Sequence, residues 1–378
     1  MSTLIQNVRI ISPDLDLADG QVLIEEGRIS QVLESGEKPL ADESIDGGGR
    51  MLMPGFFDIH SHGADRCDVC DDDLQGIRHI AQRKLQEGVT TWLPTTLTQP
   101  KEKLQSIVGT VADYMANPEF TRCPGLHIEG PFINVAKAGA QNPEFVREPD
   151  FPEIAALHAI APALIVSVAP DVNGAVEFIA EATKAGITTS AAHTAANCEQ
   201  IMAAKAAGLT HLTHFGNAMT PLHHREIGVV GTGLLDDDLM IELICDTIHL
   251  CPDMLRLMFK RVSIDRLMMI TDSMAASWID KGEVMLGGLE VVVENDTARL
   301  KEGGALAGSA LRFNHGLKHV AEITGLPLDQ IVKTTSWNQA KSLGLEGFGK
   351  IEAGYHADLV LLNEDFSVHQ TLVAGEVR

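Results

Sequence analysis

The feature that most constrains this chain is a repeated alternation of short apolar runs and amphipathic segments along its central part. Eight apolar runs are mostly separated by segments, such as DLQGIRHIAQRKLQE and GAVEFIAEATKA, in which apolar residues recur at helical spacing. Eight strands separated by helices predict an α/β fold, a TIM-like (β/α)8 barrel rather than an open doubly wound sheet. No G-x-G-x-x-G motif follows any of the runs, which argues against a dinucleotide-binding fold. The runs are residues 51–59, 89–97, 125–128, 164–169, 186–192, 210–213, 240–244 and 266–270.

The two ends of the chain have a different pattern. Residues 3–46 contain short alternating runs with a turn signal at Asp19-Gly20, which predicts a small antiparallel β unit. Residues 357–362 and 370–377 return to strand-like sequence. Both ends are therefore expected to pair with each other outside the barrel.

The run Gly47-Gly48-Gly49 is interpreted as a flexible junction between the two parts. We predict a small β-sandwich domain built from residues 1–52 plus 348–378, and a (β/α)8 metal-dependent catalytic barrel from residues 53–347.

Charge and cysteine content narrow the class of protein. The formal net charge is -23, from 29 basic and 52 acidic residues, which argues against general affinity for nucleic acid or an anionic membrane. An anionic substrate would need a local basic patch. The six cysteines show no disulfide framework, and no N-terminal signal segment or apolar run of about 20 residues is present. The sequence therefore predicts a soluble, cytoplasmic protein with free thiols.

Polar residues with metal-binding chemistry stand where the predicted strands end. The first strand ends in His-Ser-His, and His60 and His62 share one face of an extended strand, so they can hold one metal ion. The active site of a barrel lies at the carboxyl ends of its strands. Any one of these residues can equally be a satisfied structural group, but six strand ends carry an imidazole or a carboxylate. They are His60 and His62, Glu129, His193, His214, Asp246 with His249, and Asp272.

The motifs at these ends occur in a recognisable order. The stretch from PGFFDIHSHG through GLHIEGPF, HTAA, THFGNAMTPLHHRE and TDSMAA to LAGSAL resembles the N-acetylhexosamine-6-phosphate deacetylases of the amidohydrolase superfamily. The resemblance covers nearly the whole chain. The H-x-H pair is general to the superfamily, whereas HIEGPF, the NAM and LHHRE motifs and the strand-end Thr-Asp are together specific to this family.

The resemblance implies a set of metal ligands. Glu129, His193 and His214 match the main metal site, and His60 with His62 matches a second site in which Glu129 bridges the two ions. One or two divalent cations per chain are expected. Imidazole and carboxylate ligands without thiolate suit zinc, the first expectation, or iron or manganese.

Asp272 matches the family's catalytic acid and base, and we count it among the metal ligands as well. A metal cation lowers the pKa of its bound water from about 15.7 toward about 7, so hydroxide is available at neutral pH. Asp272 can accept the proton during attack on an acetamide carbonyl and return it to the leaving amine. The implied reaction converts an N-acetyl-D-hexosamine 6-phosphate, first of all the glucosamine, to the amino sugar 6-phosphate and acetate.

The same resemblance implies how a sugar phosphate is bound. Asn217, Ala218 and Met219 match the loop that receives the phosphate. Arg225 matches an arginine that reaches across a dimer interface into the neighbouring site, which implies a homodimer. The planar guanidinium and backbone N–H groups suit a phosphate dianion in an otherwise acidic protein.

His249 matches a histidine beside the acetamide and the sugar hydroxyls, and Ser309 of LAGSAL is placed with the substrate-binding residues. Gln141 departs from the family, which usually has at this position a histidine thought to polarise the acetyl carbonyl. An amide N–H can still donate a hydrogen bond to the developing oxyanion. It carries no positive charge, so weaker stabilisation is expected.

Three alternatives remain open at this stage. The substrate can be the galactosamine epimer, because no identifiable position reads the C4 hydroxyl. A ring amidase acting on hydantoins or dihydropyrimidines usually needs a carboxylated lysine, and the third strand ends in Glu129 instead. A catalytically inactive scaffold would be expected to have lost metal ligands, whereas all of them are present here, and Gln141 is the only residue that supports this alternative.

Overall fold

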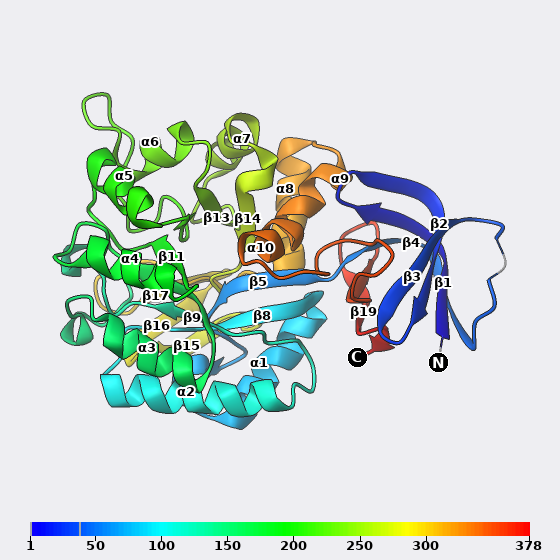
Figure 1. The fold of residues 1–378 in the computed structure, drawn as a ribbon, viewed down its shortest axis with the longest axis horizontal. Coiled ribbons are helices and arrows are strands. Elements are labelled where there is room, and N and C mark those ends of the chain that lie inside the picture. Colours follow the sequence, from blue (N-terminus) through cyan, green and yellow to red (C-terminus); the bar gives the residue numbers. More distant parts are fainter. Residues whose placement is uncertain (1, 38) are drawn as a thin grey trace.

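The computed structural model describes residues 2–37 and 39–378, and its centre is an eight-stranded parallel sheet (Figure 1). Neighbouring strands of this sheet follow one another in chain order. All eight predicted runs contain a strand, and the (β/α)8 fold is confirmed. The strands are β5 (Phe56–Ser61), β8 (Val89–Thr96), β9 (Leu126–Glu129), β10 (Ala163–Val168), β11 (Thr188–Ala191), β12 (His211–Leu212), β13 (Met240–Ile244) and β14 (Leu267–Ile270).

Buried polar contacts close the barrel between its last and first strands. The amide of Asp272 donates to the carbonyl of His60 at 2.9 Å. Lys84, which is fully buried, donates from Nζ to Asp58 Oδ2 at 3.0 Å and to Ser273 Oγ at 2.7 Å. Breaking a buried ion pair by removing one partner typically costs about 3–5 kcal/mol, so this contact ties β14 firmly to β5.

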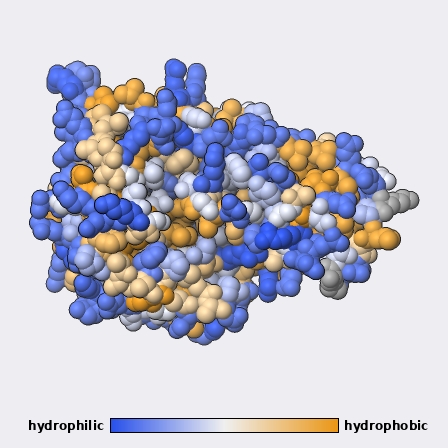
Figure 2. Space-filling model, in the orientation of Figure 1, coloured by the Kyte–Doolittle hydropathy of each residue, from blue (hydrophilic) through white to orange (hydrophobic). Residues whose placement is uncertain are grey.

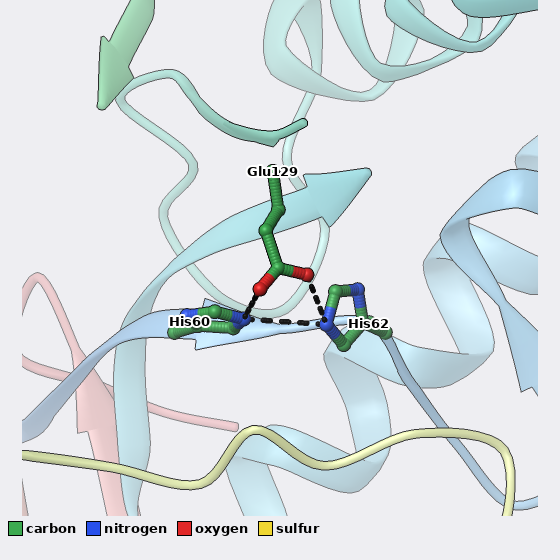
Figure 3. Close-up of side chains that lie close together, drawn as sticks. All are labelled: His60, His62 and Glu129. Carbon is green, nitrogen blue, oxygen red and sulfur yellow. Dashed lines mark hydrogen bonds and ion pairs between the residues drawn. The ribbon is translucent and has the colours of Figure 1, made fainter. Parts of the chain in front are cut away.

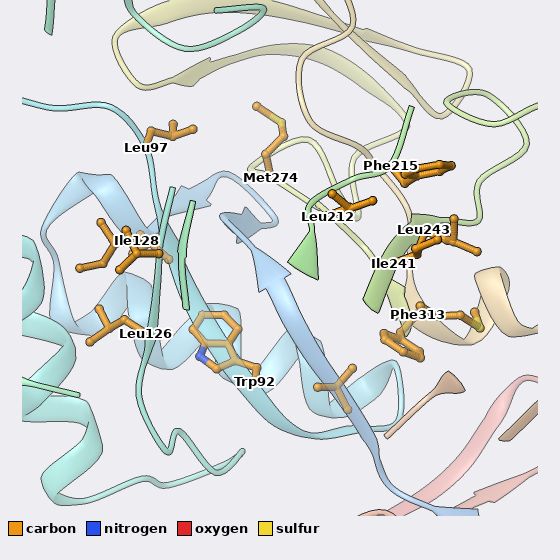
Figure 4. Close-up of a cluster of buried hydrophobic side chains, with 14 of the residues drawn as sticks. Trp92, Leu97, Leu126, Ile128, Leu212, Phe215, Ile241, Leu243, Met274 and Phe313 are labelled. Atoms are coloured by element: carbon orange, nitrogen blue, oxygen red, sulfur yellow. The ribbon is translucent and has the colours of Figure 1, made fainter. Parts of the chain in front are cut away.

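Helices surround the barrel and bury apolar side chains in the core around it. In α1, Asp73 caps the N-terminus by accepting from the amides of Gln75 and Gly76, and Ile77 and Ile80 are buried. Figure 4 shows large side chains of this core around the strands, among them Trp92 and Phe215. The helices are α1 (Leu74–Gln86), α2 (Lys101–Ala116), α3 (Phe151–Ile160), α4 (Ala175–Lys184), α5 (Cys198–Ala207), α6 (Gly228–Leu235), α7 (Pro252–Arg261), α8 (Phe313–Thr324), α9 (Leu328–Ile331) and α10 (Trp337–Ser342).

Both chain ends contribute to a second, seven-stranded sheet with its own apolar cluster, and the two termini lie close together in Figure 1. The order of its strands is β20-β19-β18-β4-β1-β2-β3. Strand β4 pairs parallel to β1 and antiparallel to β18, so the two ends of the chain meet at this strand. The strands are β1 (Ser2–Ser12), β2 (Leu15–Glu25), β3 (Arg28–Glu34), β4 (Glu43–Pro54), β18 (Leu359–Leu362), β19 (Val368–Val373) and β20 (Glu376–Val377).

Three details of the predicted organisation were wrong. The run 51–59 is divided, because β4 ends in the terminal sheet at Pro54 and β5 begins the barrel at Phe56. Gly47–Gly49 lies inside β4 rather than at a flexible junction, and Asp19-Gly20 lies inside β2. Gly47–Gly49 lie where the register of β4 on β1 jumps from the Gln6–Asp46 pair to the Val8–Arg50 pair, and Gly48 and Gly49 have φ angles of 61° and 75°, so these glycines form a bulge within a continuous strand. Gly20 is paired on both sides, with Val8 and Glu34.

The sequence did not predict a three-stranded antiparallel sheet after the barrel, formed by β15 (Lys281–Leu286), β16 (Leu289–Glu294) and β17 (Thr297–Leu300). A two-stranded ribbon, β6 (Gly63–Ala64) with β7 (Cys67–Asp68), follows the first barrel strand. Hydrophilic and hydrophobic residues are intermixed over the face drawn in Figure 2. No helix in the described part of the chain is long and apolar enough to cross a membrane.

Candidate active site

The structure brings the predicted histidines and carboxylates together at one end of the barrel, around Glu129. Glu129 Oε1 lies 3.1 Å from His193 Nε2 and 2.9 Å from His214 Nε2. Its other oxygen, Oε2, lies 3.3 Å from His62 Nε2, and His60 Nε2 lies 3.2 Å from that same nitrogen (Figure 3). One carboxylate therefore contacts two pairs of histidines through its two oxygens.

Asp272 completes the cluster from the last strand. Its Oδ1 lies 3.2 Å from His62 Nε2 and 3.4 Å from His60 Nε2. Asp272, His193 and His214 have φ angles of 49°, 44° and 32°. The left-handed region is rarely adopted by residues other than glycine, and such strain concentrates at functional sites.

The hydrogen bonds of the rings test whether these residues fit a metal. His62 Nδ1 donates to the carbonyl of Thr95 at 3.1 Å, and His193 Nδ1 donates to the carbonyl of Lys137 at 2.9 Å. Because the proton is then on Nδ1, each Nε2 lone pair points toward the carboxylate of Glu129. Acceptors that converge in this way need positive charge between them, either a proton or a cation.

Two groups of donors lie close enough to hold an ion, namely Glu129 with His193 and His214, and Glu129 with His60 and His62. These groups coincide with the two metal sites that the sequence predicted. Imidazole nitrogen and carboxylate oxygen suit zinc, iron or manganese. The donor set therefore fits one or two divalent cations that share Glu129.

The charges of the cluster are set by burial and by neighbours. Burial favours the neutral acid, but the nearby histidines, His60 first, lower the pKa of Asp272 to about 2 and hold the pKa of Glu129 well below its usual range. Burial lowers the pKa of His60 strongly, whereas hydrogen bonds to Asp272 and Glu129 outweigh burial and raise that of His62. Both carboxylates are ionised at neutral pH.

A cavity of about 380 Å³ opens above this cluster. His62, Glu129, His193, His214 and Asp272 line its floor. Leu97, Leu286 and Leu306 contribute apolar wall, the last two from the β15–β17 region and the loop after it. A volume of this size is typical of small-molecule sites, and the walls leave polar groups at few positions.

Asn217, Ala218 and His249, three of the residues predicted to bind substrate, line the cavity. His249 Nδ1 donates to Asp246 Oδ2 at 2.6 Å, which leaves its Nε2 free. Burial lowers the pKa of His249, but this bond to Asp246 outweighs burial and raises it.

Gln141 also lines the cavity, with both ends of its amide already bonded. Its Oε1 accepts from the amide of Thr98 at 2.6 Å, which fixes the orientation of the group. Its Nε2 donates to Glu129 Oε2 at 2.6 Å. The structure thus places Gln141 against the carboxylate of Glu129, and its contact with a substrate carbonyl stays a prediction.

Three predicted substrate-binding residues do not line this chain's cavity. Met219 is buried behind it, and Arg225 is exposed, with Nη1 2.9 Å from His224 Nε2. Ser309 lies behind the site, where its hydroxyl donates to the carbonyl of Thr271 at 2.5 Å. The amide of Ser309 donates to the carbonyl of Asp272 at 2.7 Å, so the observed contacts of Ser309 support the backbone of the last strand.

Two residues at the site were missed from the sequence. Lys137 is the only lysine or arginine among the described residues that line the cavity, and its Nζ lies 3.4 Å from the carbonyl of Met219. Lys137 could have been identified from the sequence as a candidate site residue, because it lies between Glu129 and Gln141 in the chain. The second missed residue, Glu242, is fully buried in β13 beneath the cluster. It could have been identified because it is a carboxylate inside an otherwise apolar strand. Burial and the charges of Glu129 and Asp272 raise the pKa of Glu242, an effect that a bound cation opposes.

A family model described as the Amidohydrolase family matches residues 51–378. Fold and site define a hydrolase of the metal-dependent amidohydrolase family, to which this chain belongs. The N-acetylglucosamine-6-phosphate deacetylase of Bacillus subtilis (strain 168) is 35% identical over 384 residues, covering 100% of this chain and 97% of the relative. The N-acetylgalactosamine-6-phosphate deacetylase of Escherichia coli O157:H7 is 31% identical over 381 residues, covering 100% and 99%.

Solved structures agree with this assignment. The N-acetylglucosamine-6-phosphate deacetylase of Thermotoga maritima is 36% identical and has a TM-score of 0.90, covering 99% of both chains. A mutant N-acetyl-D-glucosamine-6-phosphate deacetylase of Mycobacterium smegmatis, in complex with N-acetyl-D-glucosamine-6-phosphate, is 29% identical with a TM-score of 0.94, covering 100% of this chain and 99% of that one. Within the amidohydrolases, the chain is a member of the N-acetylhexosamine-6-phosphate deacetylases.

Proposed function

We propose that the protein hydrolyses the acetamide of an N-acetyl-D-hexosamine 6-phosphate, with N-acetyl-D-glucosamine 6-phosphate as the first candidate, to the amino sugar 6-phosphate and acetate. The observation that carries this proposal is the arrangement of Glu129 between two histidine pairs, with Asp272 beside one of them, on the floor of a cavity. Membership of the deacetylase family supports it.

The proposed metal ligands form two groups that share Glu129. His193 and His214 would hold one cation together with Glu129, and His60 and His62 would hold the other. Zinc is proposed first, with iron and manganese as alternatives. When bound, such cations supply Lewis acidity that activates water and polarises a carbonyl.

Asp272 is the proposed acid and base, as well as a contact of the His60 and His62 pair. The nearby histidines keep its pKa low and its carboxylate ionised, which is the form that can accept a proton from the attacking water. Its carboxylate lines the cavity, where it can return that proton to the amine nitrogen as the C–N bond breaks.

The phosphate would be recognised by positive charge and by backbone donors. Lys137 extends to the Met219 carbonyl and lines the cavity beside Asn217 and Ala218. Arg225 lies in an exposed loop, which supports its proposed role in the neighbouring site of a homodimer. A charge-assisted hydrogen bond contributes about 1.5–3 kcal/mol, so either cation can discriminate a phosphorylated sugar.

A second candidate substrate is the galactosamine epimer, which the name of the Escherichia coli relative favours. The two candidates are separated by measuring acetate release from both 6-phosphates on protein with a counted metal content. Release from neither epimer, with metal bound, contradicts the proposal. The six cysteines have no disulfide partner, which supports the proposed cytoplasmic setting.

A further inference from the structure

Glu242 is a buried carboxylate that the proposed reaction does not use. It projects from β13 into the barrel below the active site and is 0% exposed. Its Oε2 lies 3.5 Å from His60 Nδ1, and its Oε1 lies 3.7 Å from His211 Nδ1. Neither oxygen has a hydrogen-bond partner among the described residues. Burying an unsatisfied carboxylate is costly, so its position calls for a compensating role.

One role is excluded by the neighbouring hydrogen bonds. His60, His127 and Glu242 are close enough together to hold an ion. However, His127 Nδ1 donates to the carbonyl of Ile59 at 3.0 Å, and its Nε2 is bonded to Ser167 Oγ at 2.8 Å. His127 therefore has no free lone pair to offer, and this group is not a third metal site.

The second role follows from the ligand histidines. His62 and His193 each donate from Nδ1 to a backbone carbonyl, so each ring is held with Nε2 facing Glu129. His60 Nε2 faces the same cluster, but its Nδ1 points toward Glu242 and has no other partner. A shortening of about 0.5 Å would bring these two atoms to an ordinary hydrogen-bond length.

We propose that Glu242 is a positioning residue for His60. It accepts the Nδ1–H bond, fixes the tautomer and orientation of the ring, and makes Nε2 a stronger ligand for the cation shared with His62. Carboxylates behind metal-binding histidines act in this way in other proteins. The inference rests on the proposed metal sites and adds that the two sites differ, because among the described residues a carboxylate lies behind a ligand only at the His60 and His62 site.

The test is metal binding by two variants. Glu242→Leu removes the acceptor, and Glu242→Gln keeps an acceptor oxygen but removes the charge. Mn²⁺ binding is titrated by electron paramagnetic resonance, and bound metal per chain is counted by elemental analysis. We expect Glu242→Leu to lower the affinity for one of the two ions by about 10- to 100-fold and to leave the affinity for the other unchanged. The effect of Glu242→Gln should be intermediate. Thr189→Val is the control, since it removes another buried, unpartnered oxygen from a barrel strand without touching His60.

The outcomes separate this inference from the proposed function. If the folded Glu242→Leu variant binds both ions with wild-type affinity, or if its affinity for both ions falls equally, only the positioning role is overturned. A wild-type chain that binds fewer than two ions contradicts the two-ion site and this inference with it. If Glu242→Leu does not fold, the Glu242→Gln variant is used in its place. In the NMR spectrum of its Zn²⁺ form, the protected Nδ1–H proton of His60 should be shifted upfield from its position in the wild type. An unshifted resonance overturns the proposal.

Discussion

Replacing Gln141 by alanine tests how the cavity supports Glu129. The change removes the acceptor of the Thr98 amide and the donor to Glu129 Oε2, two bonds of 2.6 Å. Each buried group left unpaired costs about 1–3 kcal/mol. Because Gln141 lines the cavity, water can replace part of the lost hydrogen bonding. We therefore expect the free energy of unfolding to fall by about 2–3 kcal/mol, the lower end of the sum for the two groups.

That loss converts to a small shift in melting temperature. With about 2.1 cal/mol/K per residue, a chain of 378 residues has an unfolding entropy of about 0.8 kcal/mol/K, so Gln141→Ala should lower Tm by about 3–4 °C. Gln339→Ala is a suitable control. Gln339 is fully buried and donates to the carbonyls of Met269 and Thr334, away from the cavity, so its loss destabilises the fold without touching Glu129.

The functional effect of Gln141→Ala separates two roles. If Gln141 orients Glu129, metal affinity should fall by about 10- to 100-fold while kcat at saturating metal changes by less than about 10-fold. If it donates to the acetyl oxyanion, kcat should fall by about 100- to 1000-fold with metal affinity unchanged, and Gln141→His should raise kcat by about 10-fold. The hydrogen bonds predict the first result. Acetate release is measured at saturating metal. A fall in kcat of about 100- to 1000-fold with unchanged metal affinity would refute this reasoning.

Four further predictions follow from the site. Asp272→Asn should lower kcat by at least about 100-fold at saturating metal, measured by acetate release with the bound metal counted, and a wild-type kcat in the metal-loaded variant would contradict the acid–base role. Arg225→Ala and Lys137→Met should each raise KM for the phosphorylated sugar by about 10-fold or more and hardly affect the unphosphorylated sugar, and equal effects on both sugars would show that these cations do not bind the phosphate. Asp246→Asn should lower the pKa of His249 seen by NMR. Since that pKa is raised in the folded state, the pair stabilises the protein below about pH 6.5 and loses this effect as pH rises through the folded value, so the Tm difference from wild type should shrink at alkaline pH. Removing metal with a chelator should lower Tm by about 3 °C for each ion held at about 100 times its Kd, reversibly on adding metal back.

The barrel and its candidate metal ligands could be predicted from the sequence because both predictions depend on local pattern and on one topological rule. Apolar runs separated by helical periods specify parallel strands, and the carboxyl ends of such strands meet at one mouth. Residues that follow the runs, such as His62, Glu129 and His214, therefore had to come together whatever the details of packing. The family motifs pointed to the same positions.

Contacts between distant segments were decided only by the tertiary structure. Gln141 was read as a donor to substrate, yet its partners are Thr98 and Glu129, which lie 43 and 12 residues away. The glycines of β4 were read as a junction because local propensity does not show that Asp46 and Arg50, on either side of them, both pair with β1. Side chains in loops and inside a barrel follow no sequence period, so only the folded chain shows that Lys137 reaches the carbonyl of Met219 and that Glu242 lies behind His60, 182 residues from it in sequence.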